Sequence, residues 1–327
     1  MRYTAGALQQ FQSLPLAQKI RHAELRVKQW YEHWDGQVYV AFSGGKDSTV
    51  LLHLVRGMYP EVPAVFFDTG LEFPEIREFA MGHENVVRVR PKVTFRDVLD
   101  KYGYPVVSKR VAQYVGEVQR AKGETATKRL RLTGIKSDGT FTKLGKISDK
   151  WIPPALQTDV RISGKCCQHL KKRPAHEYED TTGRRAIIGT MAGEGQQRAL
   201  QWQMDGCNAF GAARPTSKPI SIWTEDDVWA YLKGGNRAGE QIPYSSIYEL
   251  GYPRTGCIFC AFGVHLEYRT TGTHRFLLME KTHPKLYAYC MKPREQGGLG
   301  MRKVLELIGV PWRETQLYMF KERSKYF

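Results

Sequence analysis

A glycine pair between a short apolar run and a helical stretch is the feature that most constrains how this chain can fold. Residues 38–42 are apolar and rich in β-branched and aromatic side chains, Gly44 and Gly45 follow, and apolar residues recur at helical spacing over residues 50–55. This order predicts a strand, a tight turn and a helix. Glycine accepts positive φ and lets backbone approach a ligand, and a helix N-terminus carries unpaired N–H groups and a positive dipole end. The stretch therefore predicts an anion-binding turn.

The side chains of this turn suit a phosphate. Lys46 adds a full positive charge, and the hydroxyl groups of Ser43 and Ser48 can donate hydrogen bonds to phosphate oxygens. The nucleotide-binding pattern G-x-x-x-x-G-K-[ST] is absent, because the glycines are adjacent and Lys46 follows them directly. Another phosphate-binding class is therefore indicated, and the alternative is an ordinary strand-to-helix turn with an exposed lysine.

The hexad resembles a known phosphate loop. Its sequence, Ser43-Gly44-Gly45-Lys46-Asp47-Ser48, is similar to the PP-loop of ATP pyrophosphatases, a family that cuts adenine nucleotides between the α and β phosphates or binds adenylyl sulfate. The resemblance implies that the β- and γ-phosphates of ATP lie on these residues with Mg²⁺. It also implies catalytic roles for Lys46 and Asp47.

The rest of the first two hundred residues alternates between strand and helix patterns. Strands are predicted at 63–67, 85–89 and 185–189, and helices at 14–34, 73–79 and 94–102. Such alternation predicts an α/β fold with a doubly wound, mainly parallel sheet, and a ligand at the carboxyl ends of the strands. This is the adenine nucleotide alpha hydrolase-like architecture that the PP-loop resemblance implies.

Three further residues sit at predicted strand ends. A carboxylate about twenty residues beyond a phosphate loop, at the end of the next strand, is well placed for a ribose hydroxyl. Asp68 is such a residue, with Thr69 beside it, and Gly189 closes the strand predicted at 185–189. We therefore expect all three to bind the nucleotide.

The charge of the chain indicates a polyanionic partner. The formal net charge is +16 at pH 7, which favours nucleic acid over a membrane because no amphipathic lipid-binding helix stands out. The alternative is a solvated basic surface. No run approaches the roughly 20 apolar residues that span a bilayer, and the start lacks the apolar region of a signal peptide, so we expect a cytoplasmic protein with no membrane partner.

Many of the cations lie in one segment, residues 109–150, which we interpret as a basic insertion. The turn Ser137-Asp138-Gly139-Thr140 lies between residues 129–132 and 141–144, and both flanks alternate charged and apolar side chains, which predicts a hairpin with its cations on one face. Contact with a phosphate backbone and a merely solvated hairpin are equally compatible with this pattern.

The cysteines give the second strong signal. Six cysteines in a long chain without a signal peptide indicate metal or redox chemistry rather than a disulfide framework. Cys166 and Cys167 are adjacent, and Cys257 and Cys260 form a Cys-x-x-Cys pair. Thiolates select zinc or iron–sulfur clusters, and adjacent cysteines suit separate irons better than one tetrahedral zinc. Zinc, or simple buried thiols, is the alternative.

Here a second resemblance becomes specific. A Cys-Cys pair followed by lysine and proline, and then a Cys-x-x-Cys pair, is similar to the [4Fe–4S] pattern of adenylyl-sulfate reductases in the phosphoadenylyl-sulfate (PAPS) reductase family. Residues 68–75, 218–229 and 242–252 are similar to other segments of that family in the same order, so the resemblance covers residues 38–263. It implies that the cluster ligands are Cys166, Cys167, Cys257 and Cys260. Cys207 or Cys290 could replace one of the adjacent pair, although we prefer the set without them.

With that resemblance we expect three parts. These are an N-terminal helical lead-in (1–35), a PP-loop nucleotide-binding domain (36–230) with a basic insertion at about 109–150, and a cluster-binding, helical C-terminal region (231–327).

The chain departs from the reductases of the family at two places. The reductases carry a nucleophilic cysteine in a C-terminal Glu-Cys-Gly-Leu-His segment, and residues 321–327 contain none, so the reductive step lacks its attacking thiolate. Met191 stands where the family has an arginine, two places after the strand glycine, whereas Arg198 matches a later arginine that contacts the phosphate or sulfate end.

The basic charge, the basic insertion and the missing terminal cysteine favour another branch of the same resemblance, the iron–sulfur sulfurtransferases of DNA phosphorothioation (DndC/SspD type), which have ATP pyrophosphatase activity. The interpretation is that ATP is split to AMP and pyrophosphate to activate a nucleic acid, DNA rather than tRNA, and that Arg198 neutralises charge as pyrophosphate leaves. Sulfur would come from a cysteine desulfurase, with other modification-complex proteins as partners. The alternatives are a thioredoxin-linked adenylyl-sulfate or PAPS reductase in sulfate assimilation, using Cys290 or an external thiol, and a non-catalytic nucleotide-binding module.

Overall fold

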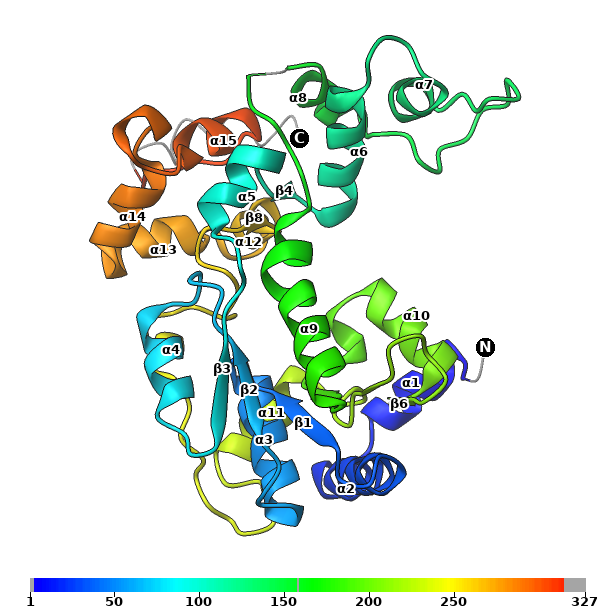
Figure 1. Cartoon of the computed structure of the whole chain (residues 1–327), viewed down its shortest axis with the longest axis vertical. Helices are drawn as coiled ribbons and strands as arrows, with labels where there is room; N and C mark the ends of the chain where they lie inside the picture. Colours follow the sequence, from blue (N-terminus) through cyan, green and yellow to red (C-terminus); the bar gives the residue numbers. More distant parts are fainter. Residues whose placement is uncertain (1–2, 158, 315–327) are drawn as a thin grey trace.

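A six-stranded sheet forms the centre of the computed structural model, which describes residues 3–157 and 159–314 (Figure 1). Its strand order is β3-β2-β1-β5-β7-β6, and every neighbouring pair is parallel except β6 and β7. The strands are β1 (Val38–Ala41), β2 (Ala64–Phe67), β3 (Val86–Val89), β5 (Arg185–Ile188), β6 (Asn208–Ala209) and β7 (Thr216–Ser217). The predicted α/β fold with a mainly parallel sheet is confirmed.

Alternate residues of the strands face helices on opposite sides of this sheet. Val38 and Val40 of β1 belong to a core cluster that includes Val27 and Trp30 of helix α2. Tyr39, between them in sequence, lies in a different cluster that includes Tyr178 of helix α9. Because both faces are covered, the strand residues are apolar almost without interruption, as is typical of parallel sheets.

The helices on and around the sheet begin and end close to the predicted bounds. The helices predicted at 14–34, 73–79 and 94–102 are α2 (Leu16–His33), α4 (Pro74–Met81) and α5 (Phe95–Tyr102), and the helix after the glycine pair is α3 (Lys46–Met58). The other helices up to the end of the sheet region are α1 (Ala5–Gln12), α9 (Arg173–Thr182), α10 (Gln196–Asp205) and α11 (Glu225–Leu232).

The start of α5 illustrates why these local predictions succeed. Thr94 Oγ1 accepts a hydrogen bond from the Asp97 N–H (3.2 Å), and Asp97 Oδ2 accepts one from the Thr94 N–H (2.8 Å). This reciprocal capping box satisfies two backbone donors that the first helical turn cannot satisfy itself.

We expect Thr94→Ala to lower the free energy of unfolding by about 1 kcal/mol, because the Asp97 N–H loses its acceptor. The shift of the urea midpoint measures this loss. Thr94→Ser keeps the oxygen and serves as the control, with a midpoint near that of the wild type. An unchanged midpoint for Thr94→Ala would contradict the capping role.

The hairpin predicted in the basic insertion is wrong. Residues 129–132 lie in helix α7 (Ala126–Thr133), which Thr125 caps at its start and Gly134 ends at φ +82°. The turn at 137–140 does form, but only one antiparallel bridge, Ile135 to Phe141, flanks it. The cations therefore lie on a helix and a loop that project from the body, and not on one face of a ribbon (Figure 1).

A second body covers the carboxyl ends of the strands. It contains α6 (Lys109–Arg120), α8 (Ile152–Leu156), α12 (Val264–Thr271), α13 (Arg275–Thr282), α14 (Pro284–Met291) and α15 (Met301–Leu307), with a parallel pair of short strands, β4 (Val106–Val107) and β8 (Ala261–Phe262). Short 3₁₀ segments are η1 (Asp149–Trp151), η3 (Ala192–Glu194), η4 (Ser246–Tyr248) and η5 (Arg294–Gln296), and η2 (Gln168–Lys172) is a π-helical turn. One core cluster joins residues 71–170 to residues 247–312, so chain segments on both sides of β5 build this body together.

No helix of the described residues is long and apolar enough to cross a membrane.

Candidate nucleotide and thiol site

The glycine turn between β1 and α3 has the geometry that the sequence predicts. Gly44 has φ +72°, and a Cβ there would lie 2.8 Å from the carbonyl oxygen of Ile76, so only glycine fits. The Ser43 and Ser48 hydroxyl groups lie 3.0 Å apart, and Ser48 Oγ also donates to the Gly45 carbonyl (2.8 Å). The turn is thus ordered by its own hydroxyl groups, with the first N–H groups of α3 directed outward.

One of these N–H groups is already hydrogen-bonded to a side chain of the protein. Tyr248 Oη accepts a hydrogen bond from the Lys46 N–H at 2.7 Å, and it lies 3.4 Å from Thr255 Oγ1. The Lys46 side chain is 5% exposed; its Nζ lies 3.2 Å from Glu225 Oε1, 3.4 Å from the Pro253 carbonyl and 5.5 Å from the centre of the Tyr248 ring. Lys46 is therefore not the exposed lysine of the alternative interpretation, since it is held inside a cavity, and phosphate binding stays a prediction.

That cavity measures about 510 Å³ and lies at the carboxyl ends of β1 and β5. Six other predicted site residues line it besides Lys46: Ser43, Gly45, Asp47, Ser48, Gly189 and, from α10, Arg198. A Cβ on Gly189 would lie 2.9 Å from the Asp47 carbonyl oxygen, so this glycine lets β5 approach the start of α3 closely. We call this space the phosphate cavity.

Two lining residues of the phosphate cavity, Asp47 and Trp223, each carry a buried polar atom without a hydrogen-bond partner in the described structure, and only Asp47 is a carboxylate. For Asp47 this atom is Oδ1, which lies 4.0 Å from Lys46 Nζ. Burial raises the pKa of Asp47, and the nearby carboxylates of Glu194 and Glu225 raise it further, whereas Lys46 lowers it. Arg254 also lowers it, so the acidic and basic neighbours are balanced, and the buried oxygen without a hydrogen bond suits a cation that binds together with a phosphate ligand.

Arg198 is placed at the mouth of the same cavity. Its guanidinium contacts Glu194, whose Oε2 also accepts a hydrogen bond from the Met191 N–H (2.8 Å). The Met191 side chain is buried in the core with Trp202 and Trp223, so it contributes no charge where the family has an arginine.

Asp68 and Thr69 are not brought into the phosphate cavity. The Asp68 side chain is 3% exposed and its Oδ2 accepts a hydrogen bond from Arg88 Nε at 2.7 Å. Burial opposes ionisation of Asp68, but hydrogen bonds from Arg88 and from the Gly70 N–H hold its pKa below the usual range. Thr69 Oγ1 donates to Glu72. The ribose contact stays a prediction.

A smaller, apolar cavity of about 120 Å³ adjoins the phosphate cavity, because Ser43, Thr255 and Gly256 line both. Phe66, Phe67, Phe73 and Ile76 form its walls, and Lys171 reaches it from η2. Concave apolar space beside an anion site is the arrangement that a base attached to a phosphate chain requires. We call it the apolar slot.

The four predicted thiols converge behind the apolar slot. Cys166 and Cys167 lie in the helical residues directly before η2, and the Cys260 N–H donates to the Cys257 carbonyl (3.1 Å), which makes a tight turn of the second pair. All four are free, and electrostatic interactions link Cys166 to Cys257 and Cys260, and Cys167 to Cys257. The tertiary structure therefore brings both pairs to one place.

Two cations compensate these thiols. A hydrogen bond from the Cys166 thiol, together with the charges of Lys109, Lys171 and Lys172, lowers the pKa of Cys167 to about 6 against the opposing effect of burial. Cys257 raises the pKa of Lys171. Burial opposes the charge of Arg275, but Glu267 and then Cys260 and Cys257 raise its pKa. Burial raises the pKa of Cys257 and raises that of Cys260 to about 11, so these two would lose their protons on binding a cluster, for which thiolates next to positive charge are the required donors. Within residues 3–157 and 159–314, no three His, Cys, Asp or Glu side chains are grouped to hold a single metal ion.

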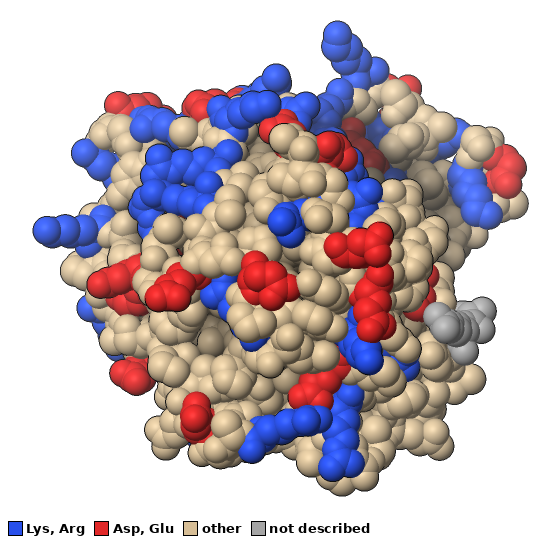
Figure 2. Space-filling view, turned by 60° about the horizontal axis from the view of Figure 1, so that its bottom comes forward, with Lys and Arg blue, Asp and Glu red and all other residues tan. Residues whose placement is uncertain are grey.

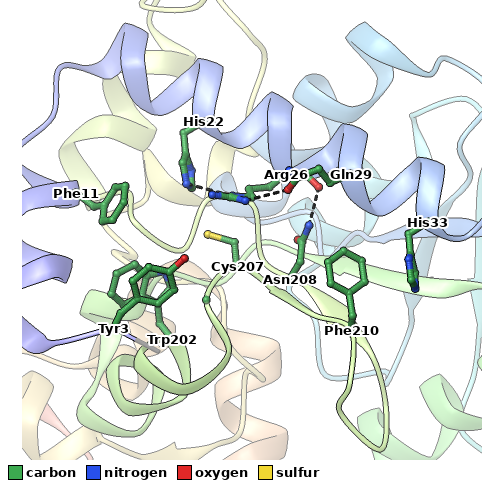
Figure 3. A pocket seen from close by; sticks show the side chains of 11 residues that line it. Tyr3, Phe11, His22, Arg26, Gln29, His33, Trp202, Cys207, Asn208 and Phe210 are labelled. Carbon is green, nitrogen blue, oxygen red and sulfur yellow. Dashed lines mark hydrogen bonds between the residues drawn. The ribbon is translucent and has the colours of Figure 1, made fainter. Parts of the chain in front are cut away.

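The remaining two cysteines lie elsewhere. Cys207 lines a separate cavity of about 310 Å³ between α2 and α10, where it faces Arg26 and Trp202 (Figure 3), and its Sγ accepts a hydrogen bond from Ser221 Oγ at 3.2 Å. Cys290 is fully buried in the apolar core, and burial raises its pKa. Neither thiol lines the phosphate cavity or the apolar slot. The prediction about residues 321–327 lies outside the described residues.

Sequence reasoning missed the residues that the second body contributes. Tyr248, Arg254, Thr255 and Arg275 all line the phosphate cavity, and Arg275 also interacts with the thiols of Cys257 and Cys260. No local pattern marks them. The available signals are position, since three of the four lie within ten residues before Cys257, and for Tyr248 also the family-like segment at 242–252.

Comparison with known proteins finds a family model and several relatives that match this chain. The model of the phosphoadenosine phosphosulfate reductase domain matches residues 37–131 and 117–262. An adenosine 5'-phosphosulfate reductase of Lysinibacillus sphaericus is 24% identical over 238 residues, which are 72% of this chain and 78% of the relative. A phosphoadenosine 5'-phosphosulfate reductase of Xanthomonas euvesicatoria is 24% identical over 253 residues, 77% of this chain and 83% of the relative.

Two further similarities complete the comparison. An uncharacterized protein of Methanocaldococcus jannaschii is 29% identical over 237 residues, 72% of this chain, and the match spans only 38% of that longer protein. The crystal structure of a PAPS reductase from Candida auris in a phosphate complex covers 72% of this chain and 87% of its own, with 15% identity and a TM-score of 0.40. Because the domain model spans the sheet, the glycine turn and both cysteine pairs, the chain belongs to the phosphoadenosine phosphosulfate reductase domain family.

Proposed function

We propose that this chain binds ATP with Mg²⁺ in the phosphate cavity and splits it to AMP and pyrophosphate, activating a nucleic acid for sulfur insertion. The observation that carries the proposal is the buried, unpartnered Oδ1 of Asp47 next to Lys46. Mg²⁺ is commonly bound by one or two carboxylates and the phosphates of a substrate. The Asp47 oxygen could therefore bind the Mg²⁺ of a polyphosphate complex, whereas a simple anion without a cation would leave it without a ligand.

Each residue of the site would have a separate role in ATP cleavage. Lys46 and the N-terminus of α3 would hold the β- and γ-phosphates, and the Tyr248 hydroxyl would yield the Lys46 N–H to a phosphate oxygen. The adenine ring would lie in the apolar slot. Arg198 would neutralise the charge that develops as an oxygen of the nucleic acid attacks the α-phosphorus and pyrophosphate leaves. The outer sulfur of a persulfide supplied by a cysteine desulfurase would then attack the activated phosphorus and displace AMP, and a thiol reductant would cleave the remaining S–S bond to leave the phosphorothioate.

The thiols fit a resident cofactor. Cys166, Cys167, Cys257 and Cys260 would hold a [4Fe–4S] cluster, which supplies low-potential electron and sulfur chemistry when bound. Lys171 interacts with Cys257 and also lines the apolar slot, so a fixed positive charge would lie between the cluster ligands and the nucleotide.

The surface supports an anionic macromolecule as the acceptor, and we propose DNA. The net charge is +16, and on the face in Figure 2 lysine and arginine gather towards the upper edge while acidic residues are scattered over the middle. The projecting insertion adds cations for which no ion pair is found in the described structure, among them Lys122, Lys128, Arg129, Lys136 and Lys143. Fixed basic surface of this kind favours phosphate-backbone contact.

A second candidate is a reductase acting on adenylyl sulfate or PAPS. The names of the relatives from Lysinibacillus and Xanthomonas favour it. In the described residues, however, no thiol besides the four converging ones adjoins the phosphate cavity, so an attacking thiolate would have to come from elsewhere.

One experiment separates the candidates. Protein purified anaerobically is incubated either with ATP and Mg²⁺, with and without DNA, or with adenylyl sulfate or PAPS and a dithiol reductant. We expect AMP and pyrophosphate from ATP, in larger amounts with DNA, and no sulfite. Sulfite without AMP from ATP would favour the reductase instead, and nucleotide binding without either product would indicate a non-catalytic module.

A further inference from the structure

A second polar cavity, of about 490 Å³, opens beyond the ends of β2 and β3, and three arginines line it. Arg77 comes from α4, Arg90 follows β3, and Arg96 comes from α5. Asp68 is the only carboxylate among the lining residues. We call this cavity the arginine groove.

The single carboxylate does not neutralise the groove. Asp68 Oδ2 is already hydrogen-bonded to Arg88, and it lies 3.4 Å from Arg77 Nη2 and 3.6 Å from Arg90 Nε. Arg96 donates to the backbone carbonyls of Gly297 and Arg294. Among the described residues, none of the three lining arginines has a carboxylate of its own.

Two of the three arginines are exposed, and Arg96 is half-buried. The side chains of Arg77 and Arg90 are 45% and 63% exposed, whereas Asp68 beneath them is 3% exposed. The buried carboxylate of Asp68 therefore holds the guanidinium groups of Arg77 and Arg90 in place. Their N–H groups on the solvent side remain free to bind a ligand. Planar guanidinium forks bind phosphate through paired hydrogen bonds, so fixed, exposed arginines of this kind select phosphate groups.

Aromatic surface lies beside this charge, next to the thiol turn. Phe259, between Cys257 and Cys260, lines the groove together with Tyr289, which is 39% exposed; the two rings are 5.9 Å apart. A hollow of about 560 Å³ shares Gly70, Arg77, Phe259 and Tyr289 with the groove and so extends it along the turn. The phosphate cavity reaches the same turn at Gly256.

We propose that the arginine groove binds a single-stranded segment of nucleic acid, with backbone phosphates on Arg77, Arg90 and Arg96 and a base against Tyr289. Basic side chains along a track with an exposed aromatic ring are the means by which proteins bind single strands. The inference rests on the proposed function, since it says where the acceptor lies. It brings the acceptor to the Cys257–Cys260 turn, which separates the groove from the phosphate cavity.

The test is the binding of a fluorescein-labelled thymidine oligonucleotide to the full chain, followed by fluorescence anisotropy at several salt concentrations. We expect Arg77→Gln/Arg90→Gln to weaken binding about tenfold and to reduce the slope of log K against log salt by about 1.4, because each phosphate contact on a single strand contributes about 0.7. We expect Tyr289→Ala to weaken binding about tenfold with an unchanged slope, because stacking releases no counterions.

A matched double variant of the projecting insertion, Lys136→Gln/Lys143→Gln, removes the same charge elsewhere and should change binding less than the groove variant. Inorganic phosphate at constant ionic strength should not displace the oligonucleotide. The inference is overturned if the insertion variant alone loses binding, if the groove variant binds as the wild type does, or if inorganic phosphate competes fully, which would make the groove a site for free phosphate.

The DNA-independent release of AMP from ATP distinguishes this inference from the proposed function. Groove variants should retain it, since none of their residues lines the phosphate cavity. If the wild type releases no AMP but the groove still binds the oligonucleotide with the expected slope, the proposed function fails and the groove assignment stands.

Discussion

Replacing Lys46 with alanine is expected to lower the release of AMP and pyrophosphate from ATP by about 10³-fold. The Nζ lies in the phosphate cavity at the start of α3, on a side chain that is 5% exposed, and its charged partners among the described residues are Glu225 and Asp47. A preorganised cation in a water-poor site stabilises the charge of a leaving pyrophosphate strongly, and removing one such donor costs about 10²–10³ in rate. Loss of the ground-state phosphate contact adds to this effect.

Lys233→Ala is the matched control, because its Nζ lies 5.8 Å from the centre of the Trp229 ring, as Lys46 Nζ does at 5.9 Å, but Lys233 does not line the phosphate cavity. It should turn over ATP as the wild type does. Both variants should keep a thermal midpoint close to that of the wild type, since the main ionic partner of Lys46, Glu225, is 49% exposed and solvent screens its charge. An AMP yield near that of the wild type from Lys46→Ala would contradict the site assignment.

Cys260→Ala is expected to lose the iron and acid-labile sulfide that anaerobically purified wild-type protein should contain, together with visible absorption from thiolate-bound iron. Clusters are held by four thiolates, and Cys260 lies on the turn that faces Cys166 and Cys167. Iron and sulfide analysis with an absorption spectrum measures the loss.

Cys207→Ala provides the control, because this thiol is also buried but lies in the cavity between α2 and α10. It should retain the full complement of iron and sulfide. Equal iron in Cys260→Ala and the wild type would remove the cluster from the proposed function, and equal loss in both variants would show that the two substitutions act through folding rather than ligation.

Local patterns predicted most of the sheet. The strands around Val40, Val65 and Ile187 are short apolar runs that both faces of a parallel sheet bury, and the helices between them carry caps such as Thr94. Apolar runs and helix caps each depend on a few neighbouring residues, so both can be recognised from the sequence alone.

The basic insertion shows the limit of such patterns. Residues 129–132 alternate charged and apolar side chains, as a strand does, but the segment forms α7. Thr125 and Gly134 cap the helix. The Arg131 side chain is largely buried, where its Nε lies 2.7 Å from a carboxylate oxygen of Glu117 and its guanidinium stacks on the Tyr114 ring. The caps were a local signal that favoured helix. The contact of Arg131 with α6 is not local. In a short segment such a tertiary contact has more influence on the structure than the alternation of charged and apolar side chains.

The sequence by itself determined the glycine turn, the helix that follows it and the two cysteine pairs, because steric freedom at glycine, helix capping and thiol chemistry belong to neighbouring residues. Only the tertiary structure decided what meets them. It placed Tyr248 on the Lys46 N–H across 202 positions, brought the cysteine pairs together behind the apolar slot, and surrounded Asp68 with arginines from α4 and β3. The reason is that the order of strands in the sheet, and the second body that closes over their ends, set these distances. Both depend on how the whole core packs, which no short stretch of the chain encodes.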